Sequence, residues 1–389
     1  MQIRTLNTAQ LAAFIHSEGY KNLQNLPITP LRALSQCNNP CAEVEDILLL
    51  LAMENEDLLG YLGMLPDVIY LNGKPEKIAW MSCLWIAPKT RGKGIAKMLI
   101  EMAFNAWNQQ VILTEFTAEA GKLYQKLGIF QDLGICEGLR VYDLAKWDSL
   151  LPMKFPKLQP FSFFLRLVSV VTKLFFHFFK AKNKDKSLLF IPITEIDAET
   201  NAFIEAKNTD FLFRRTSKEL NWLTHFPWIK EGRVGAKVRR VLPVRKAVAQ
   251  THRTSSKQSD EEISKNYYFS YQSALFRQTW IQVKDKHTQQ IVACFMLSLR
   301  ECNLKVPYFF AENAHIEAVA TWILEYLQST SASILTTFQP ELVAYFQGQK
   351  NINFRIKNTS KPYMIAQKFD LPQPFTFQIQ DGDGDCAFT

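Results

Sequence analysis

The sequence predicts an α/β protein (α+β in its arrangement) made of two domains of similar organisation. The chain has 389 residues, which is longer than one typical domain. A short apolar run, a proline, a Gly-rich basic loop and an amphipathic helix follow one another in residues 78–105. The order of strands and helices expected in residues 1–147 recurs in residues 187–389. We therefore expect domains at 1–147 and 187–389, joined by a linker at 148–186.

Composition and charge restrict the class of protein without identifying a ligand. Hydrophobic residues make up 47% of the chain, which is enough for a sizeable core. The net charge of +8 suits an anionic ligand, a membrane surface or nucleic acid. The seven cysteines form no Cys-x-x-Cys pair and indicate reduced thiols, and nothing predicts a metal site. Residues 1–10 lack the apolar core of a signal peptide, so we expect a cytoplasmic protein.

The first domain is expected to alternate strands with helices. Pro27, Pro30 and Pro40 predict a loop or broken helices across residues 25–40. Residues 54–57 are the predicted turn of a hairpin. The expected strands are 3–6, 47–53, 58–65, 78–87, 111–116 and 139–144. The expected helices are 9–18, 95–106 and 118–127.

The stretch 78–105 is the centre of this prediction. Residues 78–87 are apolar enough for a strand buried on both faces, and Pro88, which cannot donate to a ladder, marks its end. Apolar residues recur at helical spacing from Ile95. The first turn of that helix offers unpaired N–H groups and a positive dipole end, which suit a phosphate. Gly92 and Gly94 would let the backbone approach such a ligand, and the loop also carries Arg and Lys.

The loop is neither a Walker A sequence nor a GxGxxG turn. The sequence Leu84-Trp85-Ile86-Ala87-Pro88, followed by Arg91, Gly94 and Ala96, resembles motif A of the GNAT superfamily of N-acetyltransferases. The resemblance implies two acyl-CoA N-acyltransferase-like domains in tandem, each a mixed, mostly antiparallel sheet flanked by helices. It implies that acetyl-CoA is the co-substrate and that its pyrophosphate binds at the loop. It also implies that the backbone N–H groups of Leu84 and Ile86 stabilise the oxyanion. The residues implied to bind acetyl-CoA are Leu84, Trp85, Ile86, Arg91, Gly92, Lys93, Gly94, Ile95 and Ala96.

A second motif lies after the fifth predicted strand. Residues 120–130, AGKLYQKLGIF, resemble motif B of the same family, in which a Tyr precedes a Lys-Leu-Gly-Phe turn. The residue after the glycine is Ile129 where the family has Phe, which is a mild departure. Tyr124 falls on the family's tyrosine, which implies a general acid that protonates the departing CoA thiolate. A tyrosine packed against the sheet is the alternative reading.

A general base is harder to assign. The strand 78–87 contains no carboxylate or His, and Ser82 is its only hydroxyl. Glu115, at the end of the neighbouring strand, is the nearest candidate, although a solvated glutamate at a strand end is the more common arrangement. A water-relayed base, or an amine that arrives deprotonated, would also serve.

The composition changes at residue 151. A proline-punctuated linker leads into residues 161–180, an aromatic and aliphatic helix with a narrow polar stripe. That stripe consists of Ser162, Arg166, Ser169, Lys173, His177 and Lys180. The two charges inside the run disfavour a membrane span. Burial of the wide apolar face between two domains is the favoured reading, and peripheral contact with a membrane interface is the alternative.

The second domain is expected to repeat the fold without binding acetyl-CoA. The counterpart of the Gly-rich loop is 311–315, which contains no Gly, Arg or Lys, and Glu312 there would repel a pyrophosphate. The expected strands are 188–193, 278–283, 291–299, 306–310 and 334–337. The expected helices are 198–206, 314–327 and 341–346.

Two charged segments are assigned to solvent. The basic cluster at 237–246 opens a polar stretch that we expect to be disordered. Its charge would suit nucleic acid, but no aromatic stacking pattern accompanies it, so a solvated loop is the favoured interpretation. The acidic tail 381–385 begins like a calcium loop but lacks the distal Glu, so we expect a solvated tail. A further cluster belongs either to an acceptor pocket or to the second core: Arg214, Arg215, Trp222, His225, Pro227 and Trp228.

The functional expectation is an N-acetyltransferase that moves an acetyl group from acetyl-CoA to a primary amine by direct attack. The acceptor class is open, from small molecules such as amino sugars and polyamines to peptide amines and lipid headgroups. We expect it in the cytoplasm, with 161–180 as the segment that would touch a membrane. The alternative is a non-catalytic acyl-CoA-binding or membrane-associated scaffold, because the predicted motif strand lacks a carboxylate.

Overall fold

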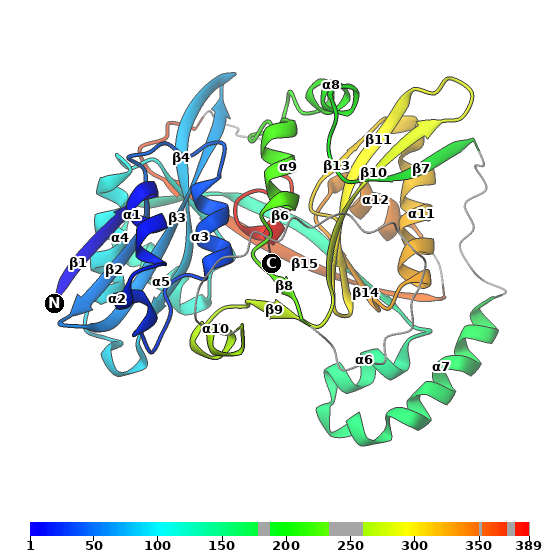
Figure 1. The fold of residues 1–389 in the computed structure, drawn as a ribbon. Coiled ribbons are helices and arrows are strands. Elements are labelled where there is room, and N and C mark those ends of the chain that lie inside the picture. The colour runs from blue at the N-terminus through cyan, green and yellow to red at the C-terminus, as the bar shows by residue number, and fades with distance from the viewer. Residues whose placement is uncertain (178–186, 233–259, 350–351, 372–377, 389) are drawn as a thin grey trace.

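One mixed sheet of 13 strands runs through the molecule from the first half of the chain into the second (Figure 1). The computed structural model describes residues 1–177, 187–232, 260–349, 352–371 and 378–388. Along the sheet the strands follow the order β1-β2-β3-β4-β5-β15-β6-β14-β12-β11-β10-β7, and β13 pairs with β11. A separate pair, β8 (Lys230–Glu231) and β9 (Gln272–Ser273), lies outside this sheet.

The first half of the chain contains the expected alternation of strands and helices. Its strands are β1 (Gln2–Asn7), β2 (Ile47–Glu54), β3 (Asp57–Leu71), β4 (Lys74–Ile86), β5 (Val111–Thr114) and β6 (Phe130–Asp143). Its helices are α1 (Thr8–Phe14), α2 (Glu18–Lys21), α3 (Pro30–Cys37), α4 (Ile95–Ala106) and α5 (Ala118–Leu127). The expected hairpin is confirmed, although its second strand, β3, and the motif strand β4 are longer than their apolar runs.

Local capping explains where several helices begin and end. Asn7 and Gln10 form a capping box at the start of α1, so this helix begins as soon as β1 ends. Within the proline-rich segment, α3 begins at Pro30 because Thr29 caps it and proline suits the first helical position. Helix α5 ends at Gly128, which adopts φ 64°, a conformation that favours glycine. These boundaries follow from residues next to each other in the sequence.

The second half repeats the order of the first. Its strands are β7 (Leu188–Ile193), β10 (Phe276–Asp285), β11 (Ile291–Arg300), β12 (Asn303–Lys305), β13 (Phe309–Ala311), β14 (Ile334–Thr337) and β15 (Phe354–Ala366). Its helices are α8 (Ala198–Lys207), α9 (Ser217–His225), α10 (Asp260–Asn266), α11 (Ile316–Ser329) and α12 (Pro340–Gly348). Of the single strand expected at 306–310, only residues 309–310 lie in a strand, β13. Residues 306–308, which include Pro307, separate it from β12. The basic cluster 237–246 lies outside the described residues.

The two halves exchange strands at the centre of the sheet. Strand β15, which the sequence analysis did not anticipate, pairs antiparallel with β5 on one side and with β6 on the other. Strand β6 in turn pairs with β14, from Leu139 opposite Thr337 to Tyr142 opposite Ile334. Each half therefore borrows a strand from the other, and the sheet cannot be divided into two separate ones.

The tail that the sequence analysis assigned to solvent is buried. Asp381, Asp383 and Phe388 are at most 3% exposed. The ring of Phe388 stacks on Trp228 at 4.3 Å, and Gly384 lies against Trp80 of β4 so closely that a Cβ would clash with the indole. The expectation of a solvated acidic tail is therefore wrong, because the segment 378–388 fills the space between the two halves.

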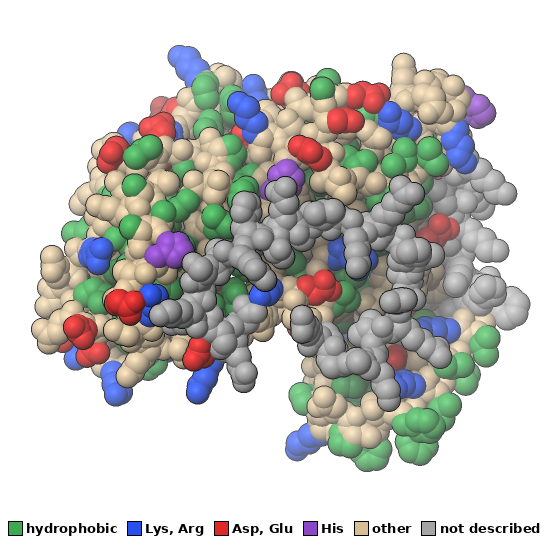
Figure 2. Space-filling model, viewed as in Figure 1, with side chains coloured by type: hydrophobic (Ala, Val, Ile, Leu, Met, Phe, Trp, Pro, Cys, Tyr) green, Lys and Arg blue, Asp and Glu red, His purple; other side chains and the backbone are tan. Residues whose placement is uncertain are grey.

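The segment after β6 forms a helical hairpin at the edge of the molecule. It consists of α6 (Trp147–Lys154), the short helix η2 (Pro156–Phe161) and α7 (Ser162–His177). Figure 1 shows α6 and α7 projecting below the sheet, and Figure 2 shows hydrophobic side chains on the surface of this lobe. The expectation that the apolar face is buried between domains is wrong, since most apolar side chains in the described part of α7 are exposed.

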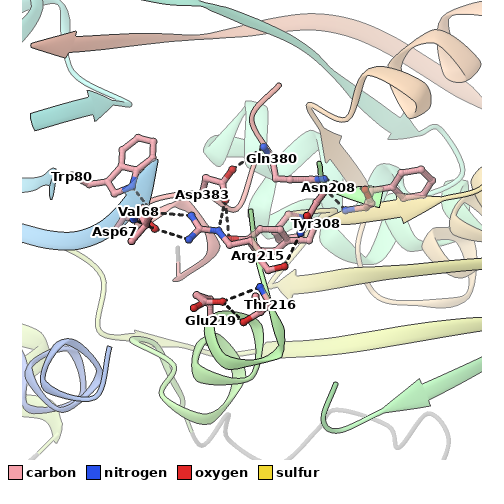
Figure 3. A network of polar contacts seen from close by, with 12 residues as sticks. Asp67, Val68, Trp80, Asn208, Arg215, Thr216, Glu219, Tyr308, Gln380 and Asp383 are labelled. Atoms are coloured by element: carbon pink, nitrogen blue, oxygen red, sulfur yellow. Dashed lines mark hydrogen bonds and ion pairs between the residues drawn. The ribbon is translucent and has the colours of Figure 1, made fainter. Parts of the chain in front are cut away.

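A buried ion-pair network ties β3 to the second half (Figure 3). Arg215 donates from Nη1 and Nη2 to the two carboxylate oxygens of Asp67, at 2.7 and 2.8 Å, and from Nε to Asp383 at 2.8 Å. Asp67 also accepts from Trp80 Nε1, and Asp383 accepts from Gln380 N and Tyr308 Oη. Arg215 thus belongs to the interior, as do the neighbouring Trp222 and Trp228, whereas His225 is exposed.

Burial raises the pKa of Asp383 to about 6, although the charge of Arg215 opposes the shift. A carboxyl whose folded pKa is raised contributes most to folding below its ordinary pKa of about 4, and loses that contribution as the pH rises through 6. Removal of Arg215 would leave two buried carboxylates without their cation, and the cost of that arrangement grows with their ionisation.

Arg215→Met should therefore lower the free energy of unfolding by about 3–5 kcal/mol at pH 8, and by less at pH 5. Urea unfolding followed by tryptophan fluorescence at both pH values measures this. The matched control is Arg214→Met, because Arg214 stacks on Tyr70 at 4.6 Å and takes no part in the network. Equal stability of the Arg215 variant and the wild type at pH 8 would contradict the assigned role.

Candidate active site

The motif strand β4 separates from β5 in the middle of the sheet. The two strands pair in parallel only at Ala79 with Val111 and at Trp80 with Ile112. Beyond this point β4 continues to Ile86, while β5 ends at Thr114. The edge of β4 from residue 81 onward therefore has no β5 partner, and the sheet opens there.

The irregular part of β4 lies beside this opening. The pairing of β3 with β4 shifts register between Tyr61 and Gly63, and Cys83 on the opposite strand has φ 58°. After this bulge the N–H of Ala87 donates to Leu59 of β3 at 2.9 Å. Successive N–H groups of a strand point in opposite directions, so those of Ile86 and Leu84 point away from β3, toward the opening. This orientation is the one that the predicted oxyanion role requires.

The Gly-rich loop is an exposed, uncapped helix start. Gly92 and Gly94 have φ values of 83° and 81°, and Gly94 precedes α4 without any side-chain cap. A Cβ added at either glycine would meet nothing within 4 Å, so the space in front of the loop is open. Arg91 and Lys93 are exposed, and Arg91 Nε donates to the carbonyl of Ile86 at 3.3 Å. The loop thus joins the end of β4 to a positive helix terminus, which fits a pyrophosphate group.

Two of the predicted binding residues turn their side chains into the protein. Trp85 is 6% exposed, and its ring stacks on that of Tyr61 at 5.4 Å. Ile95 is 3% exposed and lies close to Gly60, where a Cβ would come within 3.4 Å of it. The side chains of Trp85 and Ile95 therefore hold the loop against the sheet, and only their main chains are available to a ligand.

Tyr124 lies on α5 at the level of β5 and β6. Its ring makes edge contacts with Phe116 and Phe130 at 5.5 and 5.6 Å, and the residue is 4% exposed. Burial raises the pKa of the phenol to about 12. The hydroxyl consequently keeps its proton at neutral pH, as a general acid must before it donates. Its packing also agrees with a purely structural role, so the catalytic assignment stays a prediction.

Glu115 is placed where the sequence suggests but is paired with a cation. It follows β5 with φ 50°, and its carboxylate lies 3.0 Å from the Nζ of Lys361 on β15. Burial would raise the pKa of Glu115, but the charges of Lys361 and Lys305 together with hydrogen bonds from Lys361 and Cys386 outweigh this effect, and the pKa is lowered. A carboxylate with a lowered pKa is a weak proton acceptor, which reduces the merit of Glu115 as a base.

A different carboxylate reaches the motif strand. The tail delivers Asp385 to the bulge of β4, where its Oδ2 accepts a short hydrogen bond from Ser82 Oγ. Arg32 of α3 donates from Nη2 to the same hydroxyl at 2.9 Å and from Nη1 to Tyr267 Oη at 3.1 Å. Burial raises the pKa of Asp385, while Ser82 and Arg32 act in the opposite direction. Part of the Asp385 surface remains accessible, unlike that of its neighbours in the tail.

The matching place in the second half lacks these features. Strand β13 leads through the short helix η3 (Asn313–His315) into α11. The segment 311–315 contains no glycine or Lys/Arg, and the Glu312 carboxylate lies 3.8 Å from the His315 ring nitrogen. The start of α11 therefore offers an acidic side chain where α4 offers basic ones.

Comparison with known proteins agrees with this geometry. A family model described as an acetyltransferase (GNAT) domain matches residues 45–128, from β2 to the end of α5, which is well under half of the chain. Over these residues the chain is similar to GNAT acetyltransferase domains. None of the curated protein sequences compared with the chain matches it.

Several solved structures are similar to this chain at low sequence identity. A probable N-acyltransferase of unknown function from Enterococcus faecalis has a TM-score of 0.50 at 8% identity, over 94% of this chain and 73% of that one. A GCN5-related N-acetyltransferase from Anabaena variabilis scores 0.48 at 12% identity, over 93% and 72%. A tandem GNAT protein of clavulanic acid biosynthesis scores 0.46 at 9% identity, over 94% and 98%. The fold is that of the acyl-CoA N-acyltransferases, and the repeated element order in this chain makes it a tandem one.

Proposed function

We propose that the chain is an acetyl-CoA-dependent N-acetyltransferase that transfers an acetyl group to a primary amine at the opening between β4 and β5. The observation that carries the proposal is the uncapped start of α4. Its two left-handed glycines and two exposed basic residues stand directly after the strand end that separates from β5. A helix terminus alone would be weak support, but here it coincides with the GNAT match over residues 45–128.

Each part of the loop has a distinct task in this proposal. The backbone N–H groups at the start of α4 hold the pyrophosphate of coenzyme A, and Arg91 and Lys93 add positive charge. The N–H groups of Leu84 and Ile86 receive the oxyanion that forms when the amine attacks the thioester carbonyl. The bound co-substrate supplies the activated acetyl group, and the chain supplies its position and the proton transfers.

Two side chains carry out the proton transfers in this proposal. The hydroxyl of Tyr124, protonated at neutral pH, donates to the leaving thiolate. Asp385 is a better candidate than Glu115 for accepting the proton of the amine, because its pKa is raised and it is hydrogen-bonded to Ser82 of β4. The absence of a carboxylate from residues 78–87, which favoured a non-catalytic scaffold, is thus offset by Asp385, which the tail brings to Ser82.

The binding site can be tested with a charge placed in the loop. Gly94→Glu puts a carboxylate where the pyrophosphate should lie, so acetyl-CoA should bind the wild type at one site per chain and this variant not at all. Isothermal calorimetry measures both. Gly73→Glu is the matched control, because Gly73 also has a positive φ, 77°, and open space but lies in the β3–β4 turn. Unchanged affinity in a folded Gly94 variant would exclude the loop.

The acid role can be separated from packing. Tyr124→Phe keeps the ring contacts with Phe116 and Phe130, so acetyl-CoA affinity should persist while turnover falls by about a hundredfold. Release of free thiol measures turnover, and Tyr142→Phe on β6 serves as the control. Equal turnover of the variant and the wild type would show that Tyr124 has only a structural role.

The two candidate bases predict opposite orders of activity. Asp385→Asn should reduce turnover by about a hundredfold and remove the acidic limb of the pH–rate profile, with acetyl-CoA affinity retained. Glu115→Gln, which keeps the size of a residue paired with Lys361, should change turnover by only about a few fold. A larger loss in the Glu115 variant than in the Asp385 variant would reverse the assignment.

A further inference from the structure

The hairpin of α6, η2 and α7 is folded with its polar side inward. Within residues 156–175 Ser169 is the one buried residue. Its hydroxyl donates to the Asp148 carboxylate at 2.7 Å and accepts from the Asp148 N–H at 3.0 Å. Ser162 and Thr172 lie on the same side of α7 and are half-buried. The small polar residues of α7 therefore face α6, and its large apolar residues face outward.

The outward surface of the hairpin is extensively apolar. Aromatic and aliphatic side chains between 46% and 67% exposed cover it: Phe161, Phe163, Phe164, Leu167, Val168, Val170, Val171, Leu174 and Phe175. Figure 2 shows such side chains along the surface of this lobe. Soluble proteins rarely expose a contiguous apolar surface of this extent, because its hydration is unfavourable. An apolar phase or an apolar partner must therefore cover α7.

The charges around this surface indicate which kind of phase or partner covers it. Lys154, Lys157, Arg166 and Lys173 are all exposed, and residues 152–177 contain no Asp or Glu. A basic, apolar surface complements an anionic lipid bilayer, in which long basic side chains reach the headgroups while apolar ones enter the acyl boundary.

The sheet excludes a helix that crosses the membrane once. Helix Pro156–Phe175 is long and apolar enough to span a bilayer by length and composition. However, β6 precedes the hairpin, and its partners β14 and β15 follow it in the sequence. A single crossing would place β6 and those partners on opposite sides of the bilayer. Both ends of α7 must therefore stay on the same side.

The base of the hairpin is fixed to the second half, which holds it in one orientation. Lys146 Nζ donates to the carbonyls of Leu327, Thr330 and Ala332, between 2.5 and 2.9 Å. The hydroxyls of Ser149 and Ser333 lie 2.9 Å apart. These contacts attach α6 to the end of α11, so α7 projects from a rigid base.

From these observations we infer that the α6–α7 hairpin docks the protein on an anionic lipid surface, with α7 lying in the interface. The inference does not depend on the acetyltransferase proposal, because it uses none of the residues of that site.

The full-length protein should sediment with vesicles of phosphatidylglycerol and phosphatidylcholine, and much less with pure phosphatidylcholine. Added salt should weaken binding because it screens the basic side chains. Leu167→Asp combined with Leu174→Asp should lower vesicle affinity by roughly tenfold or more, since two anchoring side chains leave the apolar phase. Arg166→Glu combined with Lys173→Glu should abolish the preference for anionic vesicles.

The matched control replaces two equally exposed apolar residues elsewhere, Val44→Asp combined with Ile352→Asp, which should bind as the wild type does. Thiol release from acetyl-CoA should be the same in all variants. Absence of vesicle binding by the wild type would overturn the inference, as would undiminished binding of the Leu167/Leu174 variant. A dimer in light scattering that this variant dissociates, without vesicle binding, would assign the surface to a second copy instead. A requirement for detergent, rather than salt, to release the protein would show insertion and contradict surface docking.

Discussion

The antiparallel pairing of β15 between β5 and β6 is the interaction on which the rest of the structure depends. It makes one sheet of two repeated halves, and it carries Lys361 to the end of β5, beside Glu115. It also places the segment that follows β15 against β4, so that Asp385 reaches Ser82 and Asp383 reaches Arg215. Separation of the halves would remove β6 from beside β14 and β15 from beside β5.

The candidate site is consequently built from both halves. The first half supplies the open end of β4, the glycine loop and Tyr124, all within the part of the chain that matches the GNAT family model. At the matching position, residues 311–315, the second half has no glycine or basic residue, and it contributes the tail instead. In the proposed arrangement the second repeat contributes to the site through its tail, which brings Asp385 to Ser82 of β4.

Residues close together in the sequence were the predictable part of this structure. The hairpin of β2 and β3, the strand end at Pro88 and the helix that ends at Gly128 each depend on neighbouring residues, and the structure confirms them. Strand β15 was not predicted from the sequence. It contains Pro362, a residue type that argues against a central strand and that is accommodated here next to the register shift between Tyr363 and Met364.

Contacts between distant residues could not be read from local patterns. The Ser82–Asp385 hydrogen bond joins residues 303 positions apart, and the acidic tail by itself has the composition of a solvated segment. For α7 the spacing predicted the helix and its polar stripe, but not which side faces the protein. The many apolar residues of α7 suggested that this helix is buried. Instead, Ser169 donates a hydrogen bond to Asp148 of α6, and the apolar side of α7 faces outward.

The most direct test of the central claim is amine-dependent release of coenzyme A. The full-length protein is mixed with acetyl-CoA and a panel containing an amino sugar, a polyamine, a peptide amine and an aminophospholipid headgroup, and free thiol is followed over time. We expect saturable thiol release with at least one amine, well above the hydrolysis measured without it. Binding of one acetyl-CoA per chain with no amine-stimulated release from any member of the panel would contradict the account and favour a non-catalytic scaffold.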